Sequence, residues 1–227
     1  MLFRAELFQD RRDAGLVLAR AIQEWDMARD WRDGIVLGLP RGGVPVAYEV
    51  ARTLDLPLDI LVVRKLGVPG LGELAMGAVA SDGTVAMNAA VLDEFRIPVE
   101  AVEAAAAREK VEIERRELAY RNGRLPARIE GRTALLVDDG LATGASMLAA
   151  VRSVRPRARE VLVAVPVASE STCKEFRGEV DHMICARIRT PFYSVGSFYR
   201  NFEQTSDEEV CTLLSQARDG RQRWPAA

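Results

Sequence analysis

Two adjacent aspartates, Asp138 and Asp139, come directly after an aliphatic run and directly before a turn of small residues. The turn covers residues 140–146, carries the hydroxyls of Thr143 and Ser146, and leads into a helical pattern. Free backbone N–H groups at a helix start, together with the helix dipole, suit a phosphate. The carboxylates would repel that phosphate, so they suit vicinal hydroxyls of the same ligand, bound directly or through a divalent cation. The stretch therefore indicates a phosphorylated sugar.

Two other stretches carry groups that suit a diphosphate. Arg41 precedes Gly42 and Gly43, whose amides we expect to be exposed at the start of a predicted helix. Arg64 and Lys65 lie at the end of a predicted buried strand. The alternative for this second pair is two ordinary strand-end cations.

The composition excludes several other chemistries. The chain has one histidine, His182, so neither a histidine-based triad nor a multi-histidine metal site can be built; we expect a structural role at the start of a strand. Its three widely spaced cysteines fit neither a zinc pattern nor a disulfide framework. A net charge of -2 favours neither nucleic acid nor a membrane surface as a partner. No apolar run approaches the ~20 residues of a membrane span, and no secretory signal is evident, so a cytoplasmic protein is expected.

Apolar segments alternate with helical patterns, which is typical of a parallel sheet covered on both faces. We predict an α/β fold with a mainly parallel twisted sheet, helices on both faces and a small C-terminal hood. Residues 1–227 would form a single domain, with a core over about 34–186 and the hood and closing helix over about 187–227. The expected order is helix 10–30 with Asp10 as N-cap, strand 34–40, helix 43–54, strand 58–66, loop 66–73, hairpin 74–88 around Asp82-Gly83, helix 98–121, strand 132–137, helix 144–154, strand 160–166, helix 169–176, strand 180–186 and helix 205–219.

Three stretches carry a resemblance to a known family. "ALLVDDGLATGAS" (134–146) resembles the phosphoribosyl-pyrophosphate (PRPP) signature of type I phosphoribosyltransferases. "LPRGGVPVA" (39–47) is similar to the pyrophosphate loop of that family, which commonly contains a non-proline cis peptide. "VVRKLGVPGLGELAMGAV" (62–79) resembles its second strand and flexible loop. Over its whole length the chain is similar to a bacterial group whose members often lack an assigned substrate.

The resemblance implies transfer of a phosphoribosyl group from PRPP to a nitrogenous base, with Mg²⁺ as cofactor and release of pyrophosphate. Asp138 and Asp139 would hold the ribose hydroxyls and help to organise the metal indirectly. Arg41 and Lys65 would stabilise the departing pyrophosphate, with Gly42, Gly43 and Arg64 completing its site. The 5′-phosphate would be anchored by Gly140, Leu141, Ala142, Thr143, Gly144, Ala145 and Ser146. The loop at 66–73 would close over the site and exclude water.

The acceptor is less well defined by the resemblance. Hypoxanthine-guanine members carry an aspartate where this chain has Ala142, and the lysine that they use on the following strand has no counterpart in "EVLVAVPVAS" (160–169). Both departures argue against a 6-oxopurine. Glu73 is a candidate to assist the acceptor, the alternative being a solvated loop glutamate. In the hood segment "RTPFYSVGSFYRNF" (189–202), Tyr193 is the candidate to stack on the base, the alternative being core packing, whereas Phe192, Phe198 and Tyr199 suit core packing.

Two other functions remain open at this point. One is a PRPP-sensing regulator without transferase turnover, although no nucleic-acid-binding element or basic face is visible. The other is a protein that binds a phosphosugar or nucleotide other than PRPP. Family members are often dimers, so a homodimer is a further possibility that the resemblance raises.

Overall fold

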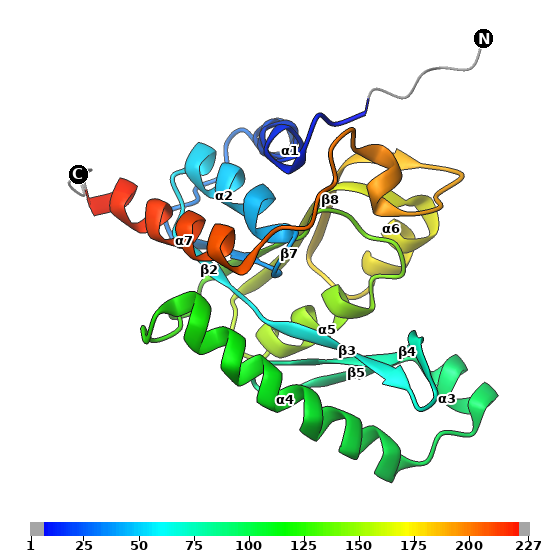
Figure 1. The fold of residues 1–227 in the computed structure, drawn as a ribbon. Helices are drawn as coiled ribbons and strands as arrows, with labels where there is room; N and C mark the ends of the chain where they lie inside the picture. Colours follow the sequence, from blue (N-terminus) through cyan, green and yellow to red (C-terminus); the bar gives the residue numbers. More distant parts are fainter. Residues whose placement is uncertain (1–6, 223–227) are drawn as a thin grey trace.

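Two β-sheets organise the chain (Figure 1). The computed structural model describes residues 7–222, without the side chains of residues 72, 73 and 220–222. The first sheet is five-stranded and parallel, in the order β2-β1-β6-β7-β8. Its strands are β1 (Gly34–Gly38), β2 (Leu58–Ile60), β6 (Thr133–Val137), β7 (Glu160–Ser169) and β8 (His182–Arg189). The predicted α/β fold with a mainly parallel sheet is confirmed.

Successive residues of these strands enter two different cores. Leu135 and Leu162 belong to one hydrophobic cluster, whereas their neighbours Leu136 and Val163 belong to another on the opposite face. Both faces are buried because side chains alternate along a strand and almost every position here is apolar. Full burial of each such aliphatic side chain contributes about 1.5–3 kcal/mol.

Helices cover both faces, as predicted. Helices α1 (Arg11–Trp25), α2 (Gly43–Leu54) and α7 (Asp207–Gln222) contribute to the first core, and α5 (Ala145–Val154) and α6 (Glu170–Phe176) to the second. The side chain of Asp10 accepts from the backbone N–H of Asp13, which confirms the predicted N-cap. Helix α1 ends at Trp25, earlier than predicted, because none of residues 26–30 is buried and a further helical turn would have no core to pack against.

The second sheet contradicts two predictions. Its strands β3 (Val63–Val68), β4 (Leu71–Ala80) and β5 (Val85–Met87) are antiparallel. The predicted strand 58–66 is therefore wrong as one element, since β2 pairs with β1 over three residues and the chain then crosses to the second sheet. The predicted loop 66–73 is also wrong, because most of it pairs within β3 and β4 around a tight turn at residues 69–70.

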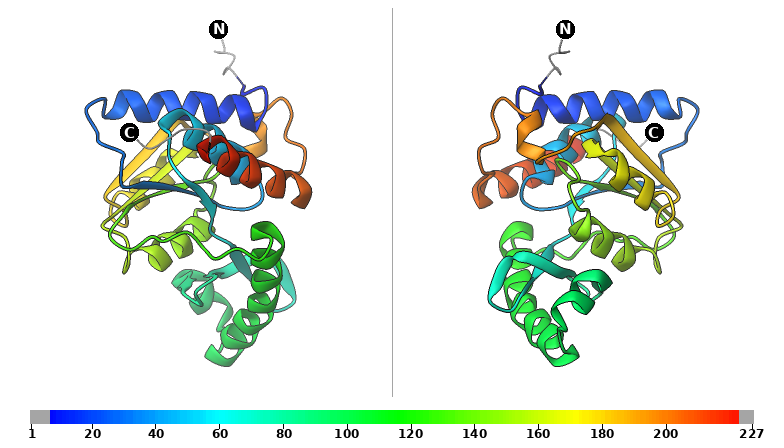
Figure 2. Two further views of the ribbon diagram at one scale, coloured as in Figure 1. Left: turned by 90° about the vertical axis from the view of Figure 1, so that its left-hand side faces the viewer. Right: turned by 90° about the vertical axis from the view of Figure 1, so that its right-hand side faces the viewer.

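Two helices accompany the second sheet. The hairpin turn around Asp82-Gly83 is confirmed, with Gly83 at φ 87°. Helix α3 (Ala89–Phe95) was not predicted, whereas α4 (Val99–Arg121) closely matches the predicted helix. Helix α4 packs on β3 and β4, and Figure 2 shows this part of the chain below the parallel sheet in both views.

No helix within residues 7–222 is both long and apolar enough to cross a membrane.

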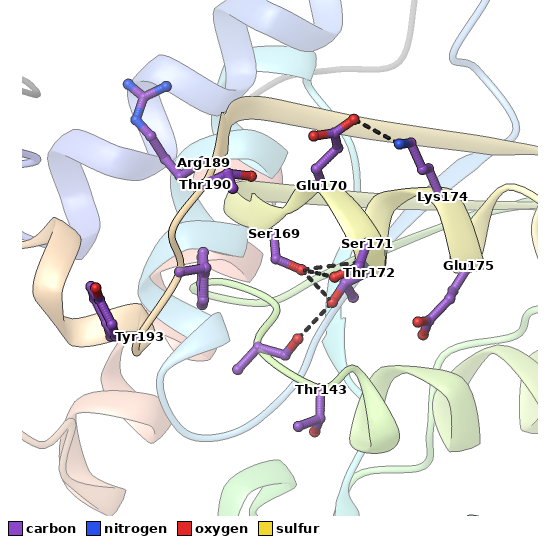
Figure 3. A pocket seen from close by; sticks show the side chains of 12 residues that line it. Thr143, Ser169, Glu170, Ser171, Thr172, Lys174, Glu175, Arg189, Thr190 and Tyr193 are labelled. Carbon is purple, nitrogen blue, oxygen red and sulfur yellow. Dashed lines mark hydrogen bonds and ion pairs between the residues drawn. The ribbon is translucent and has the colours of Figure 1, made fainter.

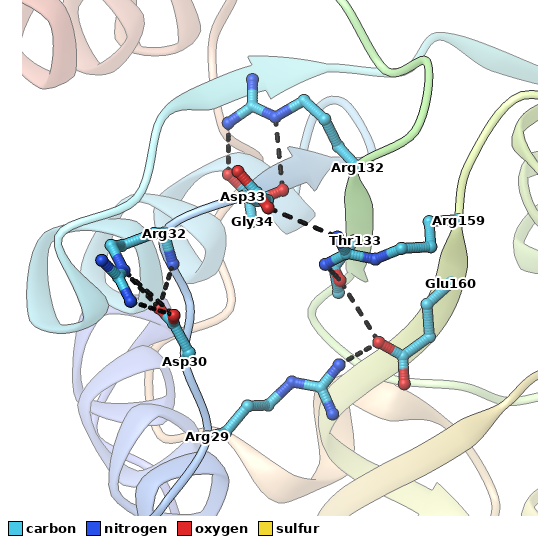
Figure 4. A network of polar contacts seen from close by, with 9 residues as sticks. All are labelled: Arg29, Asp30, Arg32, Asp33, Gly34, Arg132, Thr133, Arg159 and Glu160. Carbon is cyan, nitrogen blue, oxygen red and sulfur yellow. Dashed lines mark hydrogen bonds and ion pairs between the residues drawn. The ribbon is translucent and has the colours of Figure 1, made fainter.

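A network of charged residues covers the amino end of the parallel sheet (Figure 4). Glu160 at the start of β7 accepts from Arg29 and from Thr133, and Arg159 approaches Asp33 at 3.3 Å. His182 starts β8 beside this network, 43% exposed and 3.5 Å from Glu160, in keeping with a structural role. These ion pairs occupy the amino edge, so the carboxyl edge is the one left for a ligand.

Candidate active site

The carboxyl ends of β1 and β6 bring two of the predicted motifs together. The strands are in register, with Gly38 opposite Val137, and the N–H of Leu39 donates to the carbonyl of Val137 at 2.9 Å. The loop that starts at Pro40 and the aspartates after Val137 therefore leave the sheet side by side. The peptide bond between Pro40 and Arg41 is cis, as the resemblance implied.

Close packing joins this loop to the two aspartates. A Cβ on Gly42 would lie 2.1 Å from Oδ2 of Asp139, and a Cβ on Gly43 would lie 2.9 Å from Oδ1 of Asp138. Only glycine fits at either position. The amide of Gly43 donates to the carbonyl of Leu39 at 3.0 Å, so it is not free to bind a ligand. The expectation of an exposed amide at Gly43 is therefore wrong. The loop acts here by its close approach to the carboxylates.

The turn between β6 and α5 presents free amides. Leu141 donates to the carbonyl of Val167 at 2.9 Å, which ties the turn to β7. Within the described chain, the N–H groups of residues 142–146 donate to no protein acceptor. Gly144 has φ 72°, and a Cβ there would lie 2.5 Å from the ring of Phe176. Free amides at the start of a helix such as α5 are suited to bind an anion.

An arginine that the sequence analysis did not single out contacts the aspartate pair. Nε of Arg11 donates to Oδ2 of Asp139 at 2.8 Å, and the two side chains are 12% and 14% exposed. Arg11 also donates to the carbonyl of Glu203 at 2.6 Å and stacks on Phe202 with its guanidinium carbon 3.9 Å from the ring centre. A signal was present, because a cation in the first turn of a helix opposes the helix dipole and needs another partner.

Burial raises the pKa of both aspartates. For Asp138 the largest cause is burial, followed by the neighbouring charge of Asp139. The pKa of Asp139 is also raised by burial, although the charge and hydrogen bond of Arg11 oppose the shift. Two carboxylates that are costly to ionise side by side would be stabilised by a bound cation or by hydroxyl donors. The residues present therefore fit the predicted role of this pair.

The predicted cations are placed around this centre in different ways. Arg41 lies 3.6 Å from Asp207 at the start of α7. Nε of Arg64 is 2.7 Å from Glu109 of α4, whereas Lys65 is exposed. Burial raises the pKa of Asp138, and the charge of Lys65 opposes that rise, which puts the lysine within electrostatic reach of this aspartate.

Helix α4 contributes to a cavity of about 560 Å³ beside these cations. Arg108 and Arg116 line it together with Arg64 and Lys65, and neither α4 arginine was among the predicted site residues. From the sequence alone, Arg116 is expected to form a solvated ion pair with Glu112; the pair exists at 2.7 Å, but Arg116 is only 19% exposed. A helix rich in alternating charges gave no sign of which arginines face a cavity.

The hood segment covers the aspartate turn from the other side. A Cβ on Gly140 would lie 2.6 Å from Val195, and the hydroxyl of Tyr199 donates to the carbonyl of Asp139 at 2.5 Å. The rings of Phe192 and Phe198 pack with centres 5.0 Å apart, in keeping with the predicted core packing.

A second cavity, of about 800 Å³, opens between the hood segment and the start of α6 (Figure 3). Tyr193, 86% exposed, stands on its rim, and Thr143 brings the phosphate turn to its wall. The hydroxyl of Thr172 donates to the carbonyl of Ala142 at 2.6 Å. It also lies 2.8 Å from the hydroxyl of Ser169. The cavity thus joins the hood to the turn. The side chain of Glu73, the candidate to assist the acceptor, lies outside the described residues.

The comparisons with known proteins agree with this arrangement. The family model described as "Phosphoribosyl transferase domain" matches residues 8–192. The chain therefore belongs to the phosphoribosyl transferase domain family.

Two curated proteins from Mycobacterium tuberculosis, from strains CDC 1551 and H37Rv, are each named "Putative phosphoribosyl transferase". Each is 43% identical to the chain over 213 residues, which are 93% of the chain and 47% of the relative. The chain thus spans about half the length of these curated relatives. It is also similar to the crystal structure of the protein TT1426 from Thermus thermophilus, with 40% identity, a TM-score of 0.76, and coverage of 92% of this chain and 97% of that one.

Proposed function

We propose that the chain transfers a phosphoribosyl group from PRPP to a nitrogenous base and releases pyrophosphate, with Mg²⁺ as cofactor. The observation that carries the proposal is the packing at the carboxyl edge. There the loop of Gly42 and Gly43 lies against Asp138 and Asp139, beside a turn with free amides. Carboxylates that would accept hydrogen bonds from ribose hydroxyls thus lie beside amides that would bind a phosphate, which supports the proposal.

Each group has a role in such a reaction. The amides and hydroxyls of residues 142–146 would hold the 5′-phosphate. Asp138 and Asp139 would accept hydrogen bonds from the ribose hydroxyls and favour positive charge on the ring as its bond to pyrophosphate breaks. Arg41 and Lys65 would hold the departing pyrophosphate. No protein nucleophile is needed, so the reaction depends on positioning and charge.

A magnesium ion fits the aspartate pair only if the substrate and water supply its other ligands. Within residues 7–222 no three acidic, histidine or cysteine side chains are grouped as a metal cluster. Mg²⁺ usually keeps several waters and takes one or two carboxylates together with substrate phosphates. Asp138 and Asp139 would supply those carboxylates, and the metal would neutralise charge on the pyrophosphate.

The acceptor would occupy the cavity between the hood segment and α6. Tyr193 is exposed on its rim and free to stack on a flat heterocycle, and the Ser169 and Thr172 hydroxyls offer hydrogen bonds to ring nitrogens or oxygens. Ala142 lines the same wall, so the position of the general base of hypoxanthine-guanine members is apolar here. Adenine and uracil are therefore preferred over 6-oxopurines as first acceptors to test.

The direct test combines thermal-shift titration with a pyrophosphate assay. The protein is titrated with PRPP and Mg²⁺, alone and with adenine, hypoxanthine, guanine, uracil or orotate, and pyrophosphate is measured in the same samples. We expect stabilisation by PRPP and release with one of the bases. Stabilisation without release for any base would support a PRPP-binding regulator instead, and no effect of PRPP would contradict both functions.

A further inference from the structure

The cavity beside β3 reaches both ends of the proposed PRPP site. It is about 560 Å³ in volume and lies between β3 and α4. Its lining includes Pro40, which precedes the cis peptide, and Ser146, the last residue of the phosphate turn. A group held in this cavity would therefore lie beside the loop that starts at Pro40 and beside the end of the phosphate turn.

The charges of the lining are unbalanced. Four lining residues are cations, Arg64, Lys65, Arg108 and Arg116, and one, Glu109, is an acid. Within the described part of the chain, the side chains of Lys65 and Arg108 make no ion pair or hydrogen bond. Cations without partners that face a cavity attract an anion, and a partly enclosed site strengthens the attraction.

The other two arginines are held in place by acids of α4. Arg64 contacts Glu109 and Arg116 contacts Glu112, each through Nε at 2.7 Å. Among residues 7–222 the terminal nitrogens of these two guanidinium groups donate to no protein acceptor. The acids thus orient the arginine forks, and the terminal nitrogens remain free to bind oxygen atoms of an anion in a bidentate manner.

Two arginines of α4 line the cavity, and a third arginine beside them does not. Ala105, Ile113 and Tyr120 are buried against the second sheet and the first core. Arg108 and Arg116 lie eight residues apart, slightly more than two turns of the helix, and both line the cavity. Arg115 lies on the same helix and also pairs with Glu112, but it is 57% exposed and does not line the cavity.

We propose that Arg108 and Arg116 of α4 bind the pyrophosphate group of PRPP in this cavity, together with Lys65 and Arg64. This inference rests on the proposed function. In that reaction the acceptor nitrogen supplies the electron pair for the new bond to C1 and loses its proton to solvent. The C1–O bond breaks, and its electrons leave on the pyrophosphate oxygen. The α4 arginines are placed to hold that charge as it develops.

The test measures binding of two fragments of PRPP by calorimetry in the presence of Mg²⁺. Inorganic pyrophosphate reports on the cavity, and ribose 5-phosphate reports on the phosphate turn and the aspartates. For Arg108→Gln and Arg116→Gln we expect the Kd of pyrophosphate to rise about 10-fold, which corresponds to about 1.4 kcal/mol. The Kd of ribose 5-phosphate should stay unchanged, as should both values for the matched control Arg115→Gln.

Three outcomes would overturn the inference. They are absent binding of pyrophosphate to the wild type, an unchanged pyrophosphate Kd in both variants, and an equal loss in Arg115→Gln. Thermal melts of the variants separate a binding effect from misfolding. Because Arg108 is exposed, its substitution should disturb the fold less than that of Arg116. The proposed function is tested separately. If pyrophosphate binding depends on the α4 arginines but no base is converted, the inference stands and the transferase assignment fails.

Discussion

Arg11 and Asp139 form an ion pair between the first turn of α1 and the carboxyl end of β6, 2.8 Å long and 128 residues apart in sequence. The pair places a positive charge beside Asp139, which we expect to bind a ribose hydroxyl. It also links that aspartate to the segment before α7, because Arg11 donates to the carbonyl of Glu203. The N-terminal helix thus contacts the proposed site, although none of the predicted motifs lies in it.

Removal of this arginine should destabilise the protein. Arg11→Ala would leave the partly buried Asp139 without its cation, and we expect a loss of about 2–3 kcal/mol in the free energy of unfolding, measured by urea denaturation. Arg12→Ala is the matched control, because Arg12 is 70% exposed and Glu49, its partner at 3.1 Å, keeps Arg52. Equal effects of the two substitutions would contradict the role given to Arg11.

Gly42→Ala should damage the site through contact and not through backbone strain. Gly42 has φ -61°, which alanine adopts readily, but the added Cβ would lie 2.1 Å from Oδ2 of Asp139. We expect a lower melting temperature. The apparent Kd of PRPP in thermal-shift titrations should rise by about 10-fold or more. Gly178→Ala is the control, since its Cβ would meet nothing nearer than 3.9 Å. A Gly42→Ala variant that responds like the wild type would show that the aspartate can move without consequence.

Asp138→Asn should trade function for stability. The pKa of Asp138 is raised above its ordinary value of 3.8, so the folded protein binds more protons than the unfolded chain between the two values. The folded state is therefore penalised increasingly as pH rises through that interval, and the penalty is complete above the raised pKa.

Asparagine keeps the shape and the acceptor for the Asp139 amide but carries no charge. We expect a higher melting temperature than the wild type at about pH 7 to 8, by about 2–4 °C per kcal/mol gained, and convergence of the two below pH 3.8. Turnover should fall by about 100-fold. A variant that is less stable than the wild type at neutral pH would refute the electrostatic account.

Tyr193→Ala should affect the acceptor and leave the fold intact. The side chain is 86% exposed, so the free energy of unfolding should change by less than about 0.5 kcal/mol. If the ring stacks on the base, the KM for the acceptor should rise about 5-fold or more while the KM for PRPP stays constant. Tyr193→Phe keeps the ring and should behave like the wild type; parallel losses in both variants would point to the hydroxyl instead.

The parallel sheet and its site motifs were predictable because they depend on short-range signals. Wholly apolar runs marked the strands that end at Gly38 and Val137, and the residues that follow them had to meet at one edge of a parallel sheet. Small residues marked Gly42 and Gly144, where close approach or a positive φ excludes a side chain.

Long-range pairing explains what sequence analysis missed. Nothing in "LDILVVRKL" (58–66) indicates that the chain changes sheets after Ile60, since apolar residues continue from Ile60 to Val63 and the choice is made by the partners β1 and β4. Arg11 and Arg116 belong to amphipathic helices in which charged residues are common. Their partners, Asp139 and a cavity formed with β3, become near neighbours only in three dimensions.

The change of sheets after β2 has a consequence for how the protein can vary. Residues 63–121 leave the parallel sheet, build β3–β5, α3 and α4, and return to it at β6. The cations proposed for the leaving group on β3 and α4 therefore lie in one continuous insert, whereas the cavity proposed for the acceptor is built from segments beyond residue 141. On these proposals, changes within residues 63–121 would affect mainly the cavity for the leaving group, and changes beyond residue 141 mainly the cavity for the acceptor.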